Sequence, residues 1–165
     1  MQEIMKVNNI LEINYTCRGY CTLPYPNHPK GCPNFNKAIE CPPKSKKIKD
    51  VFDIDKDMFF VIEKFNLKEH ILKMKNKHPH WSNLQCRNLL YWQGKVRKQL
   101  KDKTEQFINF NKNKMIYTLL PEAMGVMVIN TASKLGIPIE KTPIDTVFKI
   151  ALAGYPLYDD YKDVV

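Results

Sequence analysis

The chain has 165 residues, of which 44% are hydrophobic and 26% charged, and this composition suits one globular domain with its own hydrophobic core. No apolar run reaches the roughly 20 residues of a membrane-spanning helix, and the N-terminus lacks the pattern of a secretory signal. We therefore expect a cytoplasmic protein with no membrane partner. The net charge of +9 is compatible with binding nucleic acid, although a solvated lysine-rich surface is the simpler explanation.

In chain order, the first elements surround a long irregular segment. Weak alternation of apolar residues predicts a strand at 9–15, and a loop follows at 16–50. Residues 58–65 are rich in Phe, Val and Ile and predict a second strand. Residues 67–75 have the pattern of a short helix.

The next segment predicts the longest helix of the chain. Ser82 and Gln85 have the spacing of a capping box, in which two side chains satisfy free backbone N–H groups at a helix start. The helix is expected at 83–109. Its apolar residues fall near one stripe, which indicates core packing.

The last third of the chain predicts one strand and two helices. The strand is expected at 115–120, a helix follows at 121–136, and the last helix runs over 142–154. Strands separated by helices indicate a small α/β or α+β domain that spans residues 1–165, with a short sheet and a long N-terminal cysteine loop.

The loop concentrates residues that exclude regular structure. Four of the five cysteines and six of the eleven prolines lie between Cys17 and Pro43. Proline fixes φ and removes a backbone donor, so this segment cannot be a regular helix or a central strand. Long loops are usually functional or held by something other than secondary structure. We therefore predict a metal-binding loop at 16–50, with these ligands: Cys17, Cys21, Cys32 and Cys41.

The spacing of the four cysteines favours one kind of metal. Three, ten and eight residues separate successive cysteines, so the chain has no C-x2-C pair of the kind common in structural zinc sites. Cys32 and Cys41 each precede a proline, as the last cysteine of a bacterial ferredoxin run does. The pattern favours an iron–sulfur cluster, such as a 4Fe–4S cluster, and leaves zinc as the alternative.

Two further residues have more than one interpretation. Cys86 lies in the first turns of the predicted long helix and is a fifth ligand, a reactive thiol or, as we expect, a small buried residue. His28 lies between Cys21 and Cys32, where it is either a ligand or a residue of the loop surface.

A polar and aromatic group surrounds the start of the predicted long helix. It predicts a pocket that holds an anionic small molecule near the helix N-terminus. The substrate-binding residues expected there are His78, His80, Arg87, Asn88 and Gln93. The alternative is a helix entry packed by Trp81 with solvated polar groups. No phosphate-binding glycine loop, G-x-S-x-G or H-E-x-x-H motif is present, so nucleotide hydrolysis and zinc-protease chemistry have no motif support.

Two short motifs carry a resemblance to a known family. The loop ends in Cys41-Pro42-Pro43, and Glu122-Ala123-Met124-Gly125 has an acidic-Ala-x-Gly pattern in a predicted helix. Together they resemble the uncharacterised family of small prokaryotic proteins described as predicted metal-binding. That family spaces its cysteines more closely than Cys17 and Cys21. The resemblance implies metal binding and no defined reaction.

Three functions follow as hypotheses. The first is an iron–sulfur protein that acts as an electron carrier or as an enzyme on a small molecule, where a set of three cysteine ligands would leave one iron open to substrate. The second is a zinc-stabilised nucleic-acid-binding protein that uses the basic surface. The third is a structural metal site in an interaction protein.

Overall fold

A four-stranded antiparallel sheet forms the centre of the protein. The computed structural model describes residues 3–24, 28–111, 114–140 and 142–158, and its strands lie in the order β1-β2-β4-β3. Their bounds are β1 Ile4–Lys6, β2 Met58–Asn66, β3 Ile116–Thr118 and β4 Thr146–Gly154. The antiparallel sheet with helices packed on it is an α+β fold, which confirms one of the two predicted classes.

The two central strands, β2 and β4, pair over their whole length. Met58 lies opposite Gly154, and Asn66 lies opposite Thr146. Opposite residues of an antiparallel pair point to the same face, so each face of the sheet combines alternate residues of both strands.

One face of the sheet forms the larger core. Phe60, Ile62, Ile150 and Leu152 are buried there under the N-terminal segments and α4 (Val128–Lys134). The other buried residues of this core are Val7, Ile48, Val51, Phe52, Met58, Ile116, Met124, Val126, Val128, Ala132 and Ile137. Burying a side chain the size of Leu or Ile contributes about 1.5–3 kcal/mol, so this face holds much of the fold together.

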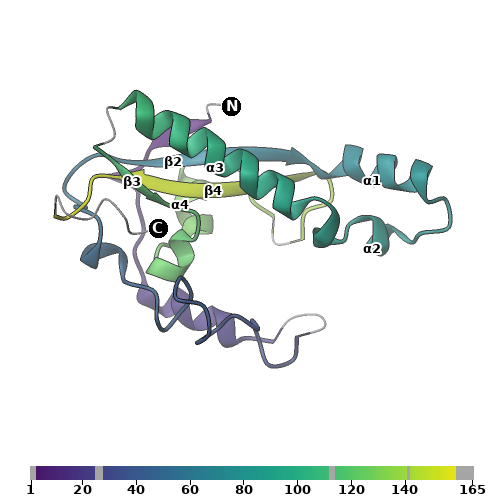
Figure 1. Ribbon diagram of the computed structural model, residues 1–165, viewed down its shortest axis with the longest axis horizontal. Coiled ribbons are helices and arrows are strands. Elements are labelled where there is room, and N and C mark those ends of the chain that lie inside the picture. Colours follow the sequence, from purple (N-terminus) through teal and green to yellow (C-terminus); the bar gives the residue numbers. More distant parts are fainter. Residues whose placement is uncertain (1–2, 25–27, 112–113, 141, 159–165) are drawn as a thin grey trace.

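The opposite face is covered by the long helix α3 (Gln93–Phe110), which Figure 1 shows lying across β2 and β4. Leu100 of α3 packs on Val61, Ala151 and Ala153. The two alanines are fully buried, and their small side chains let the helix approach the sheet closely.

The prediction of a last helix at 142–154 is wrong, because residues 146–154 form strand β4. Ala and Leu have high helix propensity and favoured a helix in the sequence. In the structure, Ile150 and Leu152 fill one core while Ala151 and Ala153 receive α3 on the other face. Pairing and packing therefore override the local preference.

The predicted long helix at 83–109 is divided into three pieces. Its capping box is confirmed, since the Gln85 main chain donates to Ser82 Oγ at 3.2 Å and the Ser82 main chain donates to Gln85 Oε1 at 2.7 Å. Helix α2 (Asn83–Cys86) then ends, a 3-10 helix η3 (Leu89–Tyr91) follows, and α3 begins at Gln93. Asn88 interrupts the helix because its backbone is not helical, with a ψ of 128°, and its side chain accepts from the Leu90 N–H at 3.0 Å.

The predicted strand at 9–15 is also wrong. The first strand is β1, and residues 8–10 form a turn. Ile10, Leu11 and Ile13 pack against the larger core without joining the sheet, and Ile13 makes only an isolated bridge with Val126.

The structure confirms the helix predicted at 67–75 and divides the helix predicted at 121–136. Helix α1 (Leu67–Lys77) confirms the predicted helix, and Asn66 Oδ1 caps it by accepting from the Glu69 N–H at 2.9 Å. The helix expected at 121–136 is divided into a 3-10 helix η4 (Pro121–Met124) and α4. Gly125 separates them because its φ of +100° belongs to the left-handed region that glycine tolerates.

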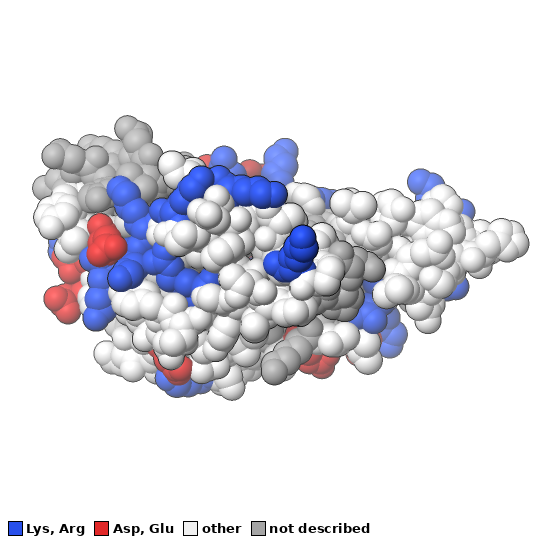
Figure 2. Space-filling view, turned by 90° about the horizontal axis from the view of Figure 1, so that it is seen from below, with Lys and Arg blue, Asp and Glu red and all other residues white. Residues whose placement is uncertain are grey.

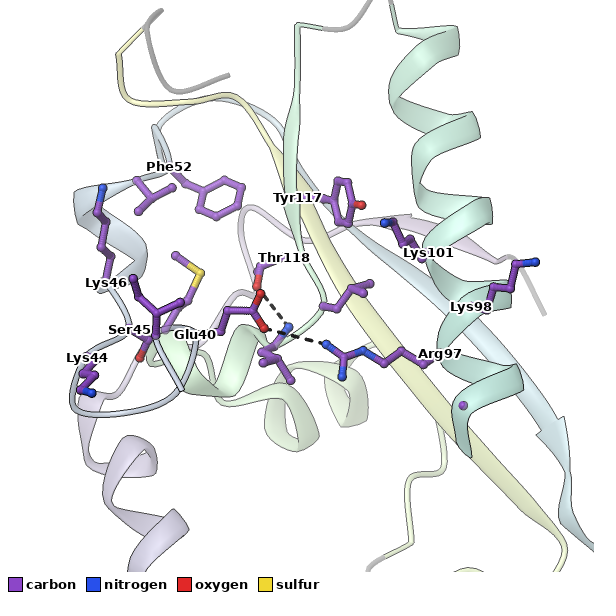
Figure 3. Close-up of a pocket in the computed structure, with 16 residues that line it drawn as sticks. Glu40, Lys44, Ser45, Lys46, Phe52, Arg97, Lys98, Lys101, Tyr117 and Thr118 are labelled. Carbon is purple, nitrogen blue, oxygen red and sulfur yellow. Dashed lines mark hydrogen bonds and ion pairs between the residues drawn. The ribbon is translucent and has the colours of Figure 1, made fainter. Parts of the chain in front are cut away.

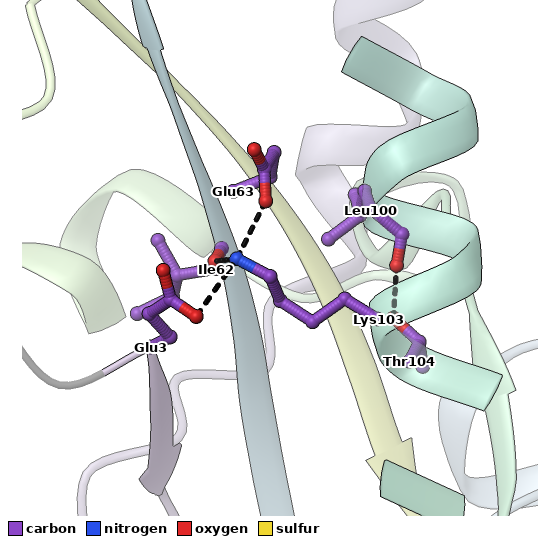
Figure 4. A network of polar contacts seen from close by, with 6 residues as sticks. All are labelled: Glu3, Ile62, Glu63, Leu100, Lys103 and Thr104. Atoms are coloured by element: carbon purple, nitrogen blue, oxygen red, sulfur yellow. Dashed lines mark hydrogen bonds and ion pairs between the residues drawn. The ribbon is translucent and has the colours of Figure 1, made fainter. Parts of the chain in front are cut away.

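Lys103 fastens α3 across the sheet (Figure 4). Its Nζ lies 2.5 Å from Glu63 Oε2 and 3.0 Å from Glu3 Oε2, and it donates to the Ile62 carbonyl oxygen at 3.2 Å. Burial alone would lower the pKa of Lys103, but the two carboxylates raise it above the usual value.

In the described part of the chain, none of the helices is long and apolar enough to cross a membrane.

Candidate metal centre

The cysteine loop begins with a 3-10 helix, η1 (Tyr15–Thr22), that carries the first two cysteines. Asn14 starts it, because the Asn14 side chain accepts from the Thr16 N–H at 3.0 Å. Thr22 closes the last turn by donating to the Gly19 carbonyl oxygen at 2.8 Å. These local bonds hold the backbone without any support from a sheet.

Cys17 is buried and faces η4. Its Sγ donates to the Glu122 carbonyl oxygen at 3.4 Å and lies 3.8 Å from the Val126 carbonyl oxygen. Burial raises the pKa of the Cys17 thiol, Glu122 raises it further, and Arg18 opposes the shift. Cys17 is therefore a protonated thiol at neutral pH, held against the second half of the chain.

Cys21 and Cys32 meet at a close backbone junction. The Cys32 N–H donates to the Cys21 carbonyl oxygen at 2.7 Å. Gly31 permits this approach, because its φ is +79° and an added Cβ would lie 2.5 Å from the same oxygen. A residue with a side chain at Gly31 would push the two cysteines apart.

The second half of the loop turns back on itself and brings in Cys41. The Asn36 N–H donates to the Pro42 carbonyl oxygen at 2.8 Å, and Asn36 has a left-handed φ of +57°. The Cys41 N–H donates to the Ala38 carbonyl oxygen at 3.1 Å.

Neighbouring thiols raise the pKa values of Cys21 and Cys41. Burial raises the pKa of Cys21, and the charges of Cys32 and Cys41 raise it further. Burial also raises the pKa of Cys41, where Cys32 and Glu40 add to the shift and Arg97 opposes it. All the cysteines are free thiols. Cys21, Cys32 and Cys41 therefore lie within reach of one another's charge, and each is partly exposed.

The described thiols do not form a coordination polyhedron. Over the described ranges, no group of three or more His, Cys, Asp or Glu side chains has the arrangement of a metal site. The donor set nevertheless fits a thiophilic metal, since thiolates are the ligands of both zinc and iron–sulfur clusters.

The end of the cysteine loop is fastened to η4. Ser45 Oγ donates to the Ala123 carbonyl oxygen at 2.8 Å. Arg18 reaches the same point, because its Nη2 donates to the carbonyl oxygens of Ser45 at 2.6 Å and of Pro43 at 3.1 Å. The chain just after Cys41-Pro42-Pro43 is thus held against η4, although 78 residues separate Ser45 from Ala123 in the sequence.

Glu122 is a site residue that the sequence analysis named only within a motif. The surrounding protein desolvates its carboxyl group and raises its pKa, while Lys149 of β4 lowers it. Glu122 as a residue is nevertheless exposed to solvent. An acidic residue directly after proline at a helix start was the signal in the sequence. Its charge in turn raises the pKa of Cys17 and Cys21.

Cys86 and His28 have different positions. Cys86 is fully buried in α2. Figure 1 shows that α1 and α2 together form an arm that projects from the sheet, away from the cysteine loop. His28 lies within the loop, half-buried, and its carbonyl oxygen accepts from the Gly31 N–H at 3.1 Å.

Four of the five predicted substrate-binding residues lie in the arm formed by α1, α2 and η3, and the fifth, Gln93, begins α3. His78 stacks on Trp81 with ring centroids 4.0 Å apart. Arg87 Nη2 donates to the Pro143 carbonyl oxygen at 2.7 Å, and Asn88 caps η3. His80 is exposed, and Gln93 is the first residue of α3. The contacts of His78, Arg87 and Asn88 are thus each made with a different partner, and none of them joins two of the five residues.

Comparisons of this chain with protein-family models, with curated proteins and with solved structures gave no match.

Proposed function

We propose that this protein binds a metal through its cysteine loop, as an iron–sulfur cluster, and acts as an electron carrier or as an enzyme on a small molecule. The observation that carries the proposal is the grouping of Cys21, Cys32 and Cys41 in a loop closed by the Cys32–Cys21 hydrogen bond, where Cys32 lies close enough to raise the pKa of both other thiols. Cys17 completes the proposed ligand set. A bound cluster would supply electron transfer or, with an open iron, Lewis-acid chemistry.

The orientation of Cys17 favours a cluster bound mainly by the other three cysteines. The other three thiols are partly exposed and lie near one another, whereas Cys17 is buried and donates to the Glu122 carbonyl oxygen. Cys17 would have to break that hydrogen bond to ligate. A cluster held by three cysteines would leave a position for a substrate, and this supports the enzyme over the electron carrier.

The cysteine loop buries too few apolar side chains for burial alone to order it. Leu23 and Ile39 are exposed, and the segment from Leu23 to Ser45 contains no helix or strand longer than an isolated bridge among its described residues. Metal–thiolate bonds would then contribute directly to the stability of the loop, because binding energy becomes folding energy.

The placement of the chain with the small prokaryotic predicted metal-binding proteins is part of this proposal. The hydrogen bond from Ser45 to Ala123 supports it, since it fastens the chain just after the Cys41-Pro42-Pro43 motif to the second motif of the resemblance. We also propose a cytoplasmic location, because free clustered thiols persist in a reducing compartment.

A zinc-stabilised nucleic-acid-binding protein is the second candidate. Figure 2 favours it, because the face seen there carries many Lys and Arg side chains and few acidic ones. Binding to DNA or RNA that depends only on this charge should vanish with salt.

One experiment separates the two candidates. The full chain is prepared under anaerobic conditions and analysed for iron, acid-labile sulfide and zinc, and its binding to short single-stranded RNA and DNA is titrated at 50 and 200 mM salt, a range over which ~6 phosphate contacts would cost about 10³-fold in affinity. We expect iron and sulfide, with nucleic-acid binding that salt abolishes. Zinc without sulfide, together with tight binding to one nucleic acid at the higher salt, would favour the second candidate.

A further inference from the structure

A cavity of about 840 Å³ lies between the cysteine loop and α3. The loop contributes one wall and α3 another, while β3 and the residues after it form a third side (Figure 3). Small-molecule sites in proteins are typically about 300–1,000 Å³, so the cavity could hold a ligand the size of a nucleotide. It involves none of the residues that the sequence predicted for substrate binding.

The cavity is strongly basic. Two of its walls carry cationic side chains: Lys44 and Lys46 on the loop, and Arg97, Lys98 and Lys101 on α3. Among the described residues that line the cavity, Glu40 is the only acid. An excess of cations on facing walls attracts and concentrates anions.

Two of the α3 cations, Arg97 and Lys101, form only weak ion pairs. Figure 3 shows Arg97 reaching across from α3 towards Glu40, and the two charged groups are 3.9 Å apart. Lys101 Nζ lies 3.7 Å from Glu105 Oε1. Both pairs are more than 40% exposed, and exposed ion pairs contribute little to stability, so a doubly charged ligand can replace them.

A further cation, Lys149, lies close enough to Arg97 to interact with its charge. Lys149 of β4 is half-buried, and burial lowers its pKa while Arg97 lowers it further and Glu122 opposes the shift. The repulsion between Lys149 and Arg97 would be relieved by an anion placed at Arg97.

The floor of the cavity is apolar. Phe52 and Met124 belong to the larger core, and Leu119 and Leu120 follow β3. Thr118 Oγ1 accepts from the Leu120 N–H at 3.1 Å, which leaves its hydroxyl hydrogen free to donate to a ligand. A ligand that matches this lining combines a charged end with an apolar ring or chain.

We propose that this cavity binds a phosphate-bearing small molecule of nucleotide size. Its phosphates lie between Arg97 and Lys101, and its apolar part lies against Phe52 and Leu120. Arg97 suits this role because a guanidinium group can donate two parallel hydrogen bonds to a phosphate. The assignment does not depend on the metal, although Glu40 and Arg97 both act on the pKa of Cys41 and so place the cavity beside the thiol group.

The test compares ligands and matched variants of the full chain. ATP, pyrophosphate and adenosine are titrated at 150 mM salt by calorimetry against the natural chain, Arg97→Gln/Lys101→Gln, and a control with the same charge change, Lys77→Gln/Lys95→Gln. All four positions are exposed, and the two control lysines do not line the cavity. Melting temperatures establish that each variant is folded.

The proposal predicts that ATP binds more tightly than pyrophosphate or adenosine. The cavity variant should bind ATP at least about tenfold more weakly, because two charge-assisted contacts are lost, while the control changes less than about twofold. Absent ATP binding, equal losses in the two double variants, or pyrophosphate binding as tightly as ATP would overturn it. Displacement of ATP by equal concentrations of a short single-stranded RNA, with equal losses in both variants, would also overturn it in favour of diffuse nucleic-acid binding.

Discussion

The Cys32 N–H donates a 2.7 Å hydrogen bond to the Cys21 carbonyl oxygen, and this bond joins the end of η1 to the second half of the cysteine loop. Ten residues separate the two cysteines in the sequence. Gly31 stands directly at the junction, with a positive φ and no room for a Cβ. The shape of the candidate metal site therefore depends on a glycine as well as on its thiols.

Gly31→Ala should disturb the site without removing a ligand. An added Cβ would lie 2.5 Å from the Cys21 carbonyl oxygen, and a left-handed φ is strained for alanine at a cost of about 1–3 kcal/mol. We expect lower metal retention on dialysis against a chelator. Gly19→Ala is the matched control, because nothing lies within 4 Å of its added Cβ. Equal retention in the two variants would contradict the role of the junction.

Cys32→Ser and Cys41→Ser should each open the cysteine loop to protease. If metal bonds order the loop, losing one ligand releases the segment, whereas the sheet core is untouched. Limited proteolysis should cut both variants within residues 16–50 faster than the natural chain. Cys86→Ala, in the buried core of the arm, should be cut there no faster than the natural chain.

Cys17→Ser should lose less metal than Cys32→Ser. The Cys17 thiol is buried and donates to the Glu122 carbonyl oxygen, and a serine hydroxyl can make the same bond. Iron per chain, measured after identical anaerobic preparation, gives the order. A greater loss in Cys17→Ser would show that Cys17 is a principal ligand and that its present orientation changes on binding.

The metal-free chain should lose stability above pH 9. The pKa values of Cys21 and Cys41 are raised above 9.0 by burial and by neighbouring thiols, so the folded state holds these protons more tightly than the unfolded state does. Their contribution is therefore fully present below pH 9 and is lost as pH rises through the raised pKa values. Urea midpoints between pH 8 and 10 should fall less steeply in Cys21→Ala/Cys41→Ala, and an unchanged slope would contradict this linkage.

Ala153→Leu should destabilise the fold by about 1–3 kcal/mol, as overpacking of a filled core does. Ala153 is fully buried on β4 in the cluster that contains Leu100 of α3, with no space for a larger side chain while the helix keeps its position. Urea denaturation measures the change. Ala38→Leu, at an exposed loop position, should leave the free energy of unfolding nearly unchanged.

The sequence predicted the elements whose local signals agree with their packing. The apolar run of β2 and the capping box at Ser82 both occur as expected. It failed at β4, where Ala151 and Ala153 are alanines because α3 lies on them, and this reason is visible only in the tertiary structure. The sequence also did not predict the break in the long helix. That break depends on a single side chain, because Asn88 accepts from the Leu90 N–H and so caps a new helical turn.

The candidate site shows the same division. Clustering of cysteines and prolines indicated an irregular segment, and its described residues include no strand of the sheet, but the sequence did not predict the 3-10 helices η1 and η2 (Ile48–Asp50) within it. The sequence could not show that Cys17 faces Glu122 or that Ser45 contacts Ala123, because these contacts join segments more than 70 residues apart. The basic cavity was also missed, since Arg97 and Glu40 come together only through packing of α3 opposite the loop.

The most direct test of the central claim is the iron, acid-labile sulfide and zinc content of the natural chain, Cys32→Ser and Cys86→Ala after identical anaerobic preparation. We predict a brown natural chain with iron and sulfide, equal content in Cys86→Ala, and a marked loss in Cys32→Ser. Stoichiometric zinc in a colourless protein, or metal loss in Cys86→Ala with Cys32→Ser still loaded, would contradict the account.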